Sequence, residues 1–184
     1  MSKLIYLSGK ARSGKDEFAK IWCKLNPSFK RMAFADAIKS KAAEILGVKL
    51  EDLSNPETKE KYRAFLIFGG QLVRSVDPLY WVKQVVNDPY FKTGDVIITD
   101  VRFPNEINEL DYWATKFDKE IIRIRMVASE EVRLARGANP EFFNDISETA
   151  LDNFDPAYFT TFVNDSTLEH LEDCAKFIEK TIDW

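Results

Sequence analysis

The chain has 184 residues, of which 45% are hydrophobic and 30% charged, a size and balance typical of one globular domain with a sizeable core. Its net charge of −4 argues against a protein that binds nucleic acid chiefly by neutralising backbone phosphates. No apolar run reaches transmembrane length and the amino terminus lacks a signal-peptide core, so we expect a cytoplasmic protein without a membrane partner.

Strands and helices alternate along the predicted chain. Apolar or alternating runs predict strands at residues 4–7, 30–35, 96–99, 121–127 and 160–163. Helical spacing predicts helices at residues 15–25, 36–46, 57–76, 78–85, 106–117, 129–136 and 167–182. This alternation predicts a mostly parallel sheet with helices on both faces. Ligands bind such sheets at the carboxyl ends of the strands.

The first strand runs into SGKARSGKD, residues 8–16, which has the glycine and lysine spacing of a phosphate-binding loop. Gly9 and Gly14 allow the backbone N–H groups to face inward, and Lys15 and Arg12 supply cations. Asp16 replaces the usual Ser or Thr. With magnesium present a carboxylate is a good oxygen ligand, so we expect stronger magnesium dependence. The alternative is a plain glycine turn between a strand and a helix.

A polar face is predicted near the end of the helix at residues 57–76. Gln71, Arg74 and Asp77 are spaced three apart and are expected on one side of it, where they would read a small polar ligand. Tyr80 and Trp81 are expected to add an aromatic wall. The alternative is a half-buried polar network with core aromatics.

The apolar strand at residues 96–99 leads into Asp100 and Arg102. At the carboxyl edge of the sheet we expect Asp100 to face magnesium through its water shell. We expect Arg102 to hold a phosphate, the alternative being an Asp–Arg pair that ties a loop.

Two further arginines follow the fourth strand. Arg133 and Arg136 are three residues apart behind Ser129, the expected helix cap, and they suit a lid that closes over phosphates. The alternative is a solvated charged face paired with Glu130 and Glu131.

Cysteine and histidine usage narrows the chemistry. Cys23 and Cys174 are far apart and are expected to be free thiols. His170 is the single histidine and falls off the apolar stripe of its helix, which predicts a surface position. These counts exclude a multi-histidine metal site and argue against a catalytic triad around a core histidine.

Six blocks, in order from residue 8 to 171, together resemble a deoxynucleoside monophosphate kinase of the bacteriophage type. They are SGKARSGKD, FADAIK, GGQLVRSVDPLYWVK, ITDVRFPNE, ISETALD and FVNDSTLEHL. The aspartate after the loop lysine and the DVRF block with its nearby acid are the most specific. Ala37 departs from the family, where proline is expected. Animal-type phosphomevalonate kinases resemble the chain at the loop, its aspartate included, and we expect no further likeness to them.

The resemblance implies a fold and an activity. The fold is α/β, a three-layer P-loop nucleoside monophosphate kinase fold with a parallel five-stranded sheet and helices on both faces. One domain, 1–184, would have a core (1–35, 94–128 and 158–184), an NMP-binding region (about 36–93) and a lid (about 129–157). The activity is transfer of the γ-phosphate of ATP to a deoxynucleoside monophosphate, with magnesium as cofactor. Relatives imply a homodimer, and a viral source would place it in the host cytoplasm.

The resemblance also assigns residue roles. Catalytic cations would be Lys15, Arg102, Arg133 and Arg136. ATP would bind to Gly9, Lys10, Ala11, Arg12, Ser13, Gly14, Lys15 and Asp16, with Asn164 near the adenine. The acceptor would contact Phe34, Asp36, Lys39, Gln71, Arg74, Asp77, Trp81 and Arg102. Magnesium would lie by Asp16 and Asp100. The acceptor phosphate oxygen is already ionised, so no general base is required.

Two other functions remain open. One is a kinase for a different phosphorylated acceptor such as phosphomevalonate, which offers no ring for stacking. The other is a nucleotide-binding protein without turnover, which has less need of lid arginines. A purely structural domain leaves the combination of loop, strand-end acid and lid unexplained.

Overall fold

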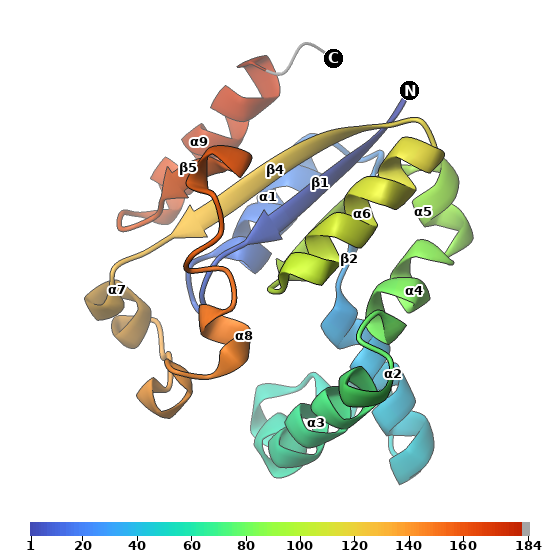
Figure 1. The fold of residues 1–184 in the computed structure, drawn as a ribbon. Coiled ribbons are helices and arrows are strands. Elements are labelled where there is room, and N and C mark those ends of the chain that lie inside the picture. Colours follow the sequence, from blue (N-terminus) through green and yellow to red (C-terminus); the bar gives the residue numbers. More distant parts are fainter. Residues whose placement is uncertain (182–184) are drawn as a thin grey trace.

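A five-stranded sheet forms the centre of the computed structural model (Figure 1). The structure describes residues 1–181 and, within them, the side chains of all but residues 56–60. The strand order is β2-β3-β1-β4-β5, and the four pairings between neighbours are parallel. The strands are β1 (Ser2–Ser8), β2 (Phe29–Met32), β3 (Asp95–Val101), β4 (Lys119–Val127) and β5 (Thr160–Val163). The predicted parallel sheet is confirmed.

Helices cover both faces of the sheet, as predicted. On one face, α1 (Lys15–Leu25) and α9 (Leu168–Thr181) contribute Phe18, Trp22 and Leu171 to a buried cluster. The other face is covered by α4 (Tyr80–Val86), α5 (Pro89–Thr93) and α6 (Pro104–Lys116). The result is a helix–sheet–helix sandwich.

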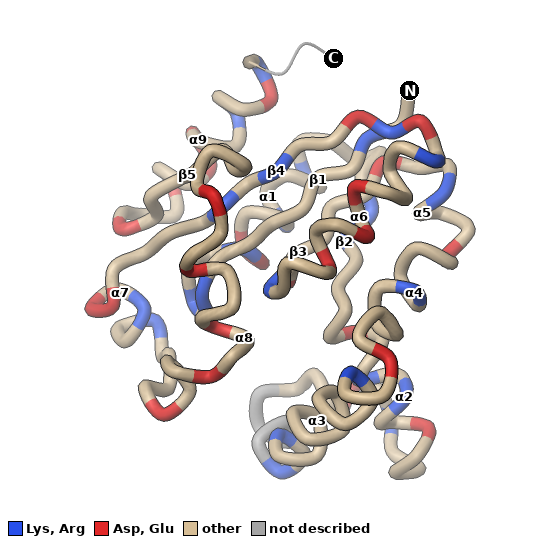
Figure 2. Tube along the Cα trace, in the orientation of Figure 1, with Lys and Arg blue, Asp and Glu red and all other residues tan. Residues whose placement is uncertain are grey.

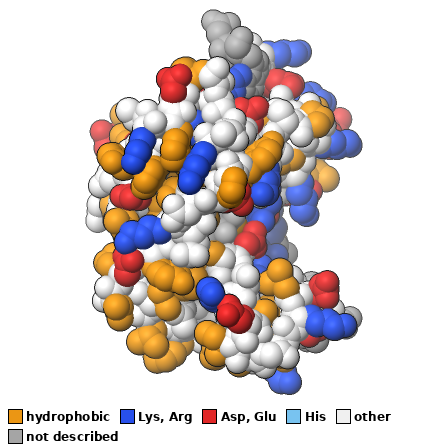
Figure 3. Space-filling model, turned by 90° about the vertical axis from the view of Figure 1, so that its right-hand side faces the viewer, with side chains coloured by type: hydrophobic (Ala, Val, Ile, Leu, Met, Phe, Trp, Pro, Cys, Tyr) orange, Lys and Arg blue, Asp and Glu red, His pale blue; other side chains and the backbone are white. Residues whose placement is uncertain are grey.

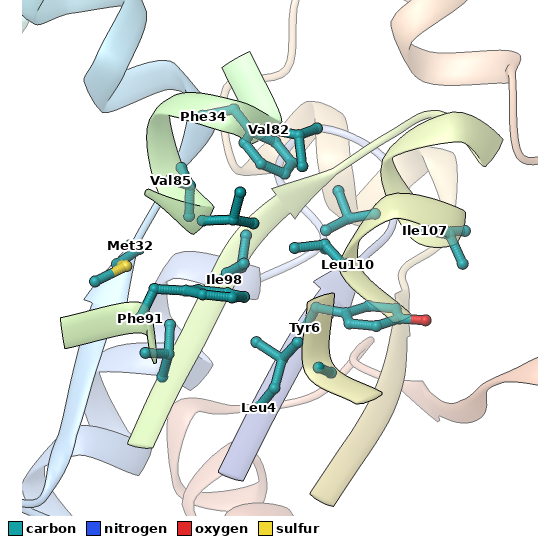
Figure 4. Packing of buried hydrophobic residues seen from close by; sticks show 14 of the residues in the cluster. Leu4, Tyr6, Met32, Phe34, Val82, Val85, Phe91, Ile98, Ile107 and Leu110 are labelled. Carbon is teal, nitrogen blue, oxygen red and sulfur yellow. The ribbon is translucent and has the colours of Figure 1, made fainter. Parts of the chain in front are cut away.

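The central strand β1 explains why both faces are packed. Its side chains alternate, so that Leu4 and Tyr6 join one core and Ile5 and Leu7 join the other. Figure 4 shows Leu4 and Tyr6 with Phe91 of α5 in the first of these cores. A strand buried on both faces needs this uninterrupted apolar run.

The remaining helices lie beyond the carboxyl ends of the strands, where they frame a site (Figure 1). Between β2 and α4 come α2 (Phe34–Leu46), the 3₁₀ turn η1 (Leu50–Leu53) and α3 (Pro56–Val76). Between β4 and β5 come α7 (Glu130–Ala135), η2 (Pro140–Phe142), α8 (Ile146–Thr149) and η3 (Pro156–Tyr158). Among the helices of residues 1–181, none combines the length and apolar character that a membrane crossing requires.

Several predicted boundaries move for identifiable reasons. The strand predicted to reach residue 35 ends at Met32, because Asp100 accepts the N–H groups of Phe34 and Ala35 and so begins α2 there. The helix predicted from residue 78 begins at Tyr80. The turns α5, α8, η1, η2 and η3 were not predicted. Ile182, the predicted end of the last helix, lies outside the described residues.

Candidate functional site

Residues 9–14 form a tight turn from β1 into α1. Gly9 (φ 133°), Arg12 (φ 63°) and Gly14 (φ 99°) adopt left-handed backbone conformations. A Cβ atom on Gly9 would lie 2.1 Å from the carbonyl oxygen of Met126 in β4. The predicted turn therefore forms, and it requires glycine at its first position.

Lys15 is drawn into the centre of this turn. Its Nζ donates to the carbonyl oxygens of Gly9 (2.6 Å) and Lys10 (2.8 Å), and the residue is 6% exposed. Burial, followed by the charge of Arg102, lowers the pKa of Lys15 to about 7. The predicted loop cation is thus enclosed by backbone oxygens.

Asn164 braces the loop from behind. It follows β5, is buried, and its Nδ2 donates to the carbonyl oxygen of Ser13 at 2.9 Å. A Cβ atom on Gly14 would lie 2.1 Å from the same Nδ2. The resemblance assigns Asn164 to adenine; its observed contact is with the loop backbone.

A cleft of about 470 Å³ opens between the loop, α2, α3 and residues 137–148. Figure 3 shows the molecule indented between its upper part, which holds the sheet, and its lower part, which holds α2 and α3. Predicted site residues that line the cleft are Ala11, Arg12, Asp16, Phe34, Lys39, Gln71, Arg74, Asp100 and Arg102. The sequence therefore locates much of this cleft.

Two carboxylates on the cleft wall are suited to magnesium. Asp16 forms an ion pair with Arg31 at 3.1 Å, and although burial opposes it, Arg31 holds the pKa of Asp16 below its usual value. Asp100 accepts two backbone N–H groups at the start of α2, while burial raises its pKa.

Within the described part of the chain, no three His, Cys, Asp or Glu side chains gather as a ready-made metal cage. Magnesium is commonly held by one or two carboxylates together with waters and substrate phosphates. The two cleft carboxylates fit that pattern.

Arg102 and Arg133 meet at a carboxylate that the sequence did not single out. Arg102 Nη1 donates to the Glu148 carboxylate and to the carbonyl oxygen of Ser147 (3.0 Å). Arg133 Nη2 donates to Glu148 Oε2 (3.3 Å) and its Nε to the carbonyl oxygen of Ala11 (2.8 Å). The ISETALD block contains Glu148, but its reach across the cleft was not readable from spacing.

The two predicted lid arginines point to different places. Arg133 is buried, so the alternative of a solvated charged face is wrong for it. Arg136 ends α7 as its carboxyl cap and donates Nη2 to the carbonyl oxygen of Ser166 at 3.3 Å. Despite their i, i+3 spacing, Arg133 bonds to the loop and to Glu148, whereas Arg136 bonds to the turn after β5.

Three predicted acceptor residues lie off the cleft wall. Trp81 is 3% exposed and donates Nε1 to the carbonyl oxygen of Gly70 at 3.1 Å, so its predicted place on an aromatic wall is wrong. Asp77 lies past the end of α3 and pairs with Lys83 at 2.8 Å, so it does not share the face of Gln71. Asp36 is paired with Arg31 at 2.6 Å.

Four groups missing from the predicted site do line the cleft. Arg31 and Arg63 add cations, and Phe142 lies under Arg63, whose Cζ is 4.9 Å from the ring centroid. Glu106 pairs with Arg74 at 3.0 Å, and burial raises the pKa of Glu106 to about 7. Its position as the first-turn acid of α6 was predicted; its burial beside the cleft was not.

The phosphomevalonate kinase family model matches residues 7–118. The match extends well beyond the loop, so the expectation that the likeness would stop there is wrong. The uncharacterized protein ORF77 of Ictalurid herpesvirus 1 (strain Auburn) is 31% identical over 170 residues, covering 90% of this chain. The chain spans 65% of the length of that relative.

Solved structures support the fold. A sugar kinase from Janibacter sp. aligns with a TM-score of 0.53 and 14% identity, covering 99% of this chain and 96% of that one. Shikimate kinase from Aquifex aeolicus aligns with a TM-score of 0.50 and 14% identity, covering 96% of each chain. The fold is that of the P-loop kinases, and the chain belongs to the phosphomevalonate kinase family.

Proposed function

We propose that the protein transfers the γ-phosphate of ATP to the phosphate group of a small acceptor, with deoxynucleoside monophosphates as the first candidates. The observation that carries this proposal is a cleft with cations on two sides. Arg12 lies on the loop side, and Arg63 and Arg74 lie on α3. Transfer between two phosphates brings two anions together, and cations on both sides offset their repulsion.

The chain's own residues account for the transfer step. Lys15, Arg102 and Arg133 surround the loop and would stabilise charge that spreads over the transferred group. Asp16 and Asp100 would hold magnesium, which supplies further neutralisation of the phosphates when bound. The acceptor oxygen is already ionised, so alignment replaces a general base.

A nucleotide base is favoured by the rings and the amide of the cleft. Phe103 lies under Arg74, whose Cζ is 4.5 Å from the ring centroid, and Phe142 lies similarly under Arg63. Rings that carry a flat guanidinium on one face also suit a flat base. Gln71 offers both donor and acceptor groups from α3.

Phosphomevalonate is the second candidate acceptor, favoured by the family match over residues 7–118. It carries a carboxylate at the end of the chain opposite its phosphate, and Lys39 adds a further cation to the cleft wall. It has no ring to stack, so phenylalanine substitutions separate the two candidates. Phe142→Leu would weaken nucleotide use more than phosphomevalonate use.

The test is ADP release from ATP and magnesium, with each of the four deoxynucleoside monophosphates, one ribonucleotide and phosphomevalonate offered in turn. Release that depends on a deoxynucleotide supports the first candidate, and release only with phosphomevalonate supports the second. Lys15→Met serves as the inactive control. If none of these acceptors causes ADP release, the proposal is contradicted.

A further inference from the structure

Glu148 of α8 reaches across the site and accepts hydrogen bonds from three donor groups. Its Oε2 accepts the backbone N–H of Ala11 in the loop (2.7 Å) and a guanidinium N–H of Arg133 (3.3 Å). Its Oε1 accepts from Arg102. The Glu148 side chain is 6% exposed, so these bonds form in a largely dry setting.

These three donors are the kind that a phosphoryl group requires. A loop N–H and two guanidinium forks bind carboxylate and phosphate oxygens alike. We propose that Glu148 is an internal anion that occupies the place of the transferred phosphoryl group, and that the phosphates of ATP displace it. This inference rests on the proposed function, which gives Arg102 and Arg133 to the phosphates.

The cations around the loop explain why an anion is needed there. Lys15 and Arg133 are buried and Arg102 is half-buried beside them, so without Glu148 three like charges would lie together with little solvent between them. When ATP arrives, the same carboxylate becomes a like charge next to the phosphates. The present position of Glu148 is therefore favourable without ATP and unfavourable once the phosphates of ATP are bound.

The helix that carries Glu148 is short and has its own cap, so a local shift of α8 would release the carboxylate. Helix α8 has four residues and is capped by Asp145, whose carboxylate accepts the N–H of Ser147 at 2.8 Å. Its Ile146 is 59% exposed, so little core is disturbed if α8 shifts. Loss of the bond between Arg102 and the Ser147 carbonyl oxygen would accompany this shift.

An internal competitor has a measurable signature. A ligand phosphate binds only to molecules in which the carboxylate has left the site. The apparent affinity for that ligand is therefore the intrinsic affinity multiplied by the fraction of molecules in which Glu148 does not occupy the site. Glu148→Gln keeps the shape and removes the charge, so it should tighten polyphosphate binding and lower the melting temperature of the empty protein. If Glu148 instead only positioned Arg102 and Arg133 for phosphate, Glu148→Gln would weaken polyphosphate binding.

The experiment is calorimetric titration of the wild-type protein and Glu148→Gln with tripolyphosphate, magnesium-ATP and adenosine. We expect tripolyphosphate to bind about 5–10-fold more tightly to the variant, with magnesium-ATP following and adenosine unchanged. Glu17→Gln is the control, because it removes the same charge from an exposed side chain of α1 that pairs with Lys20 at 2.9 Å. This variant should bind tripolyphosphate as tightly as the wild type. If Glu148→Gln does not fold, Glu148→Ala replaces it, and tighter tripolyphosphate binding is expected there as well.

The outcomes separate this inference from the proposed function. Unchanged or weaker tripolyphosphate binding in the folded variant overturns the inference, even if acceptor-dependent turnover is found. Tighter binding supports it, even if every acceptor tested fails. Binding of tripolyphosphate to neither protein overturns both, because the loop would then not be a phosphate site.

Discussion

The loop at residues 9–16 and the α2–α3 region form opposite sides of one cleft and are built in contrasting ways. Ser13 and Lys15 are buried, and the loop is held from behind by Asn164. In contrast, α3 exposes Phe68 (66%) and Val76 (84%) on its outer surface. The loop carries Lys10, Arg12 and Lys15 against one acidic residue, Asp16, whereas Figure 2 shows both basic and acidic residues on α2.

The difference indicates a division of labour. Groups that stabilise developing charge act best when they are fixed before the reaction, and the loop has the internal bonds to achieve this. A region with fewer buried contacts has lower local stability and adapts more readily to a ligand. We therefore expect phosphate chemistry to depend on the loop, and acceptor choice to depend on α2 and α3.

The largest effect should follow removal of the loop cation. Lys15→Met is expected to lower turnover about 100–1,000-fold, the range found when one preorganised electrostatic group is removed. The melting temperature should also fall, because the carbonyl oxygens of Gly9 and Lys10 lose a buried donor, so turnover is compared at a temperature where the variant is folded. Lys20→Met, which removes an exposed lysine of α1 paired with Glu17, is the control. A variant that keeps wild-type turnover would show that the loop does not act on phosphates.

The next effect tests whether the loop is as tightly fitted as its bonds indicate. Gly9→Ala should lower the free energy of unfolding by roughly 2–5 kcal/mol, through left-handed strain and the clash with the Met126 carbonyl. Gly47→Ala at the end of α2 is the matched control, because Gly47 is also left-handed (φ 64°) but has open space around it. It should cost about 1 kcal/mol. Equal losses in urea unfolding would contradict a tight loop.

A pH-dependent effect should arise where α6 meets α3. Burial raises the pKa of Glu106 from 4.5 to about 7, although backbone N–H groups and Arg74 oppose the rise. Between these values the folded protein binds more protons than the unfolded chain, so stability falls as pH rises from about 4.5 to about 7. The predicted loss attributable to Glu106 is on the order of 3 kcal/mol.

Glu106→Gln should flatten this part of the stability profile, measured by urea unfolding at several pH values. Glu109→Gln on the same helix is the matched removal of charge. A profile of unchanged slope in Glu106→Gln would show that Glu106 does not take up the proton.

Local sequence patterns correctly predicted the elements and turns whose formation depends on residues close together in the sequence. The bounds of α1 (Lys15–Leu25) and β5 (Thr160–Val163) match the predicted ranges, because helical spacing and a short apolar run determine them. The loop geometry was also predictable, since the required glycines lie within six residues of each other. Asp100 was correctly placed at the cleft, although its role in starting α2 was not foreseen.

The missed groups depend on contacts between distant segments. Glu148 meets Arg102 across 46 residues of sequence, and no periodicity reports such a pairing. Arg31 gains its role by joining Asp16 to Asp36, which needs the start of α1 and α2 in place. A single sequence gives the residue types for such clusters but not their partners.

The smallest effect concerns Trp81, which turns toward α3 instead of the cleft. Trp81→Phe removes the bond to the Gly70 carbonyl and should lower the free energy of unfolding by about 1–2 kcal/mol. Because that bond fixes α3, KM for the acceptor should rise about 2–10-fold while KM for ATP stays unchanged. Trp113→Phe is the control, since Trp113 also donates Nε1 (2.8 Å, to Glu109) but lies on α6, outside the residues that line the cleft. A rise in KM for ATP alone would contradict the assignment of acceptor binding to α3, because it would show that Trp81 supports ATP binding instead.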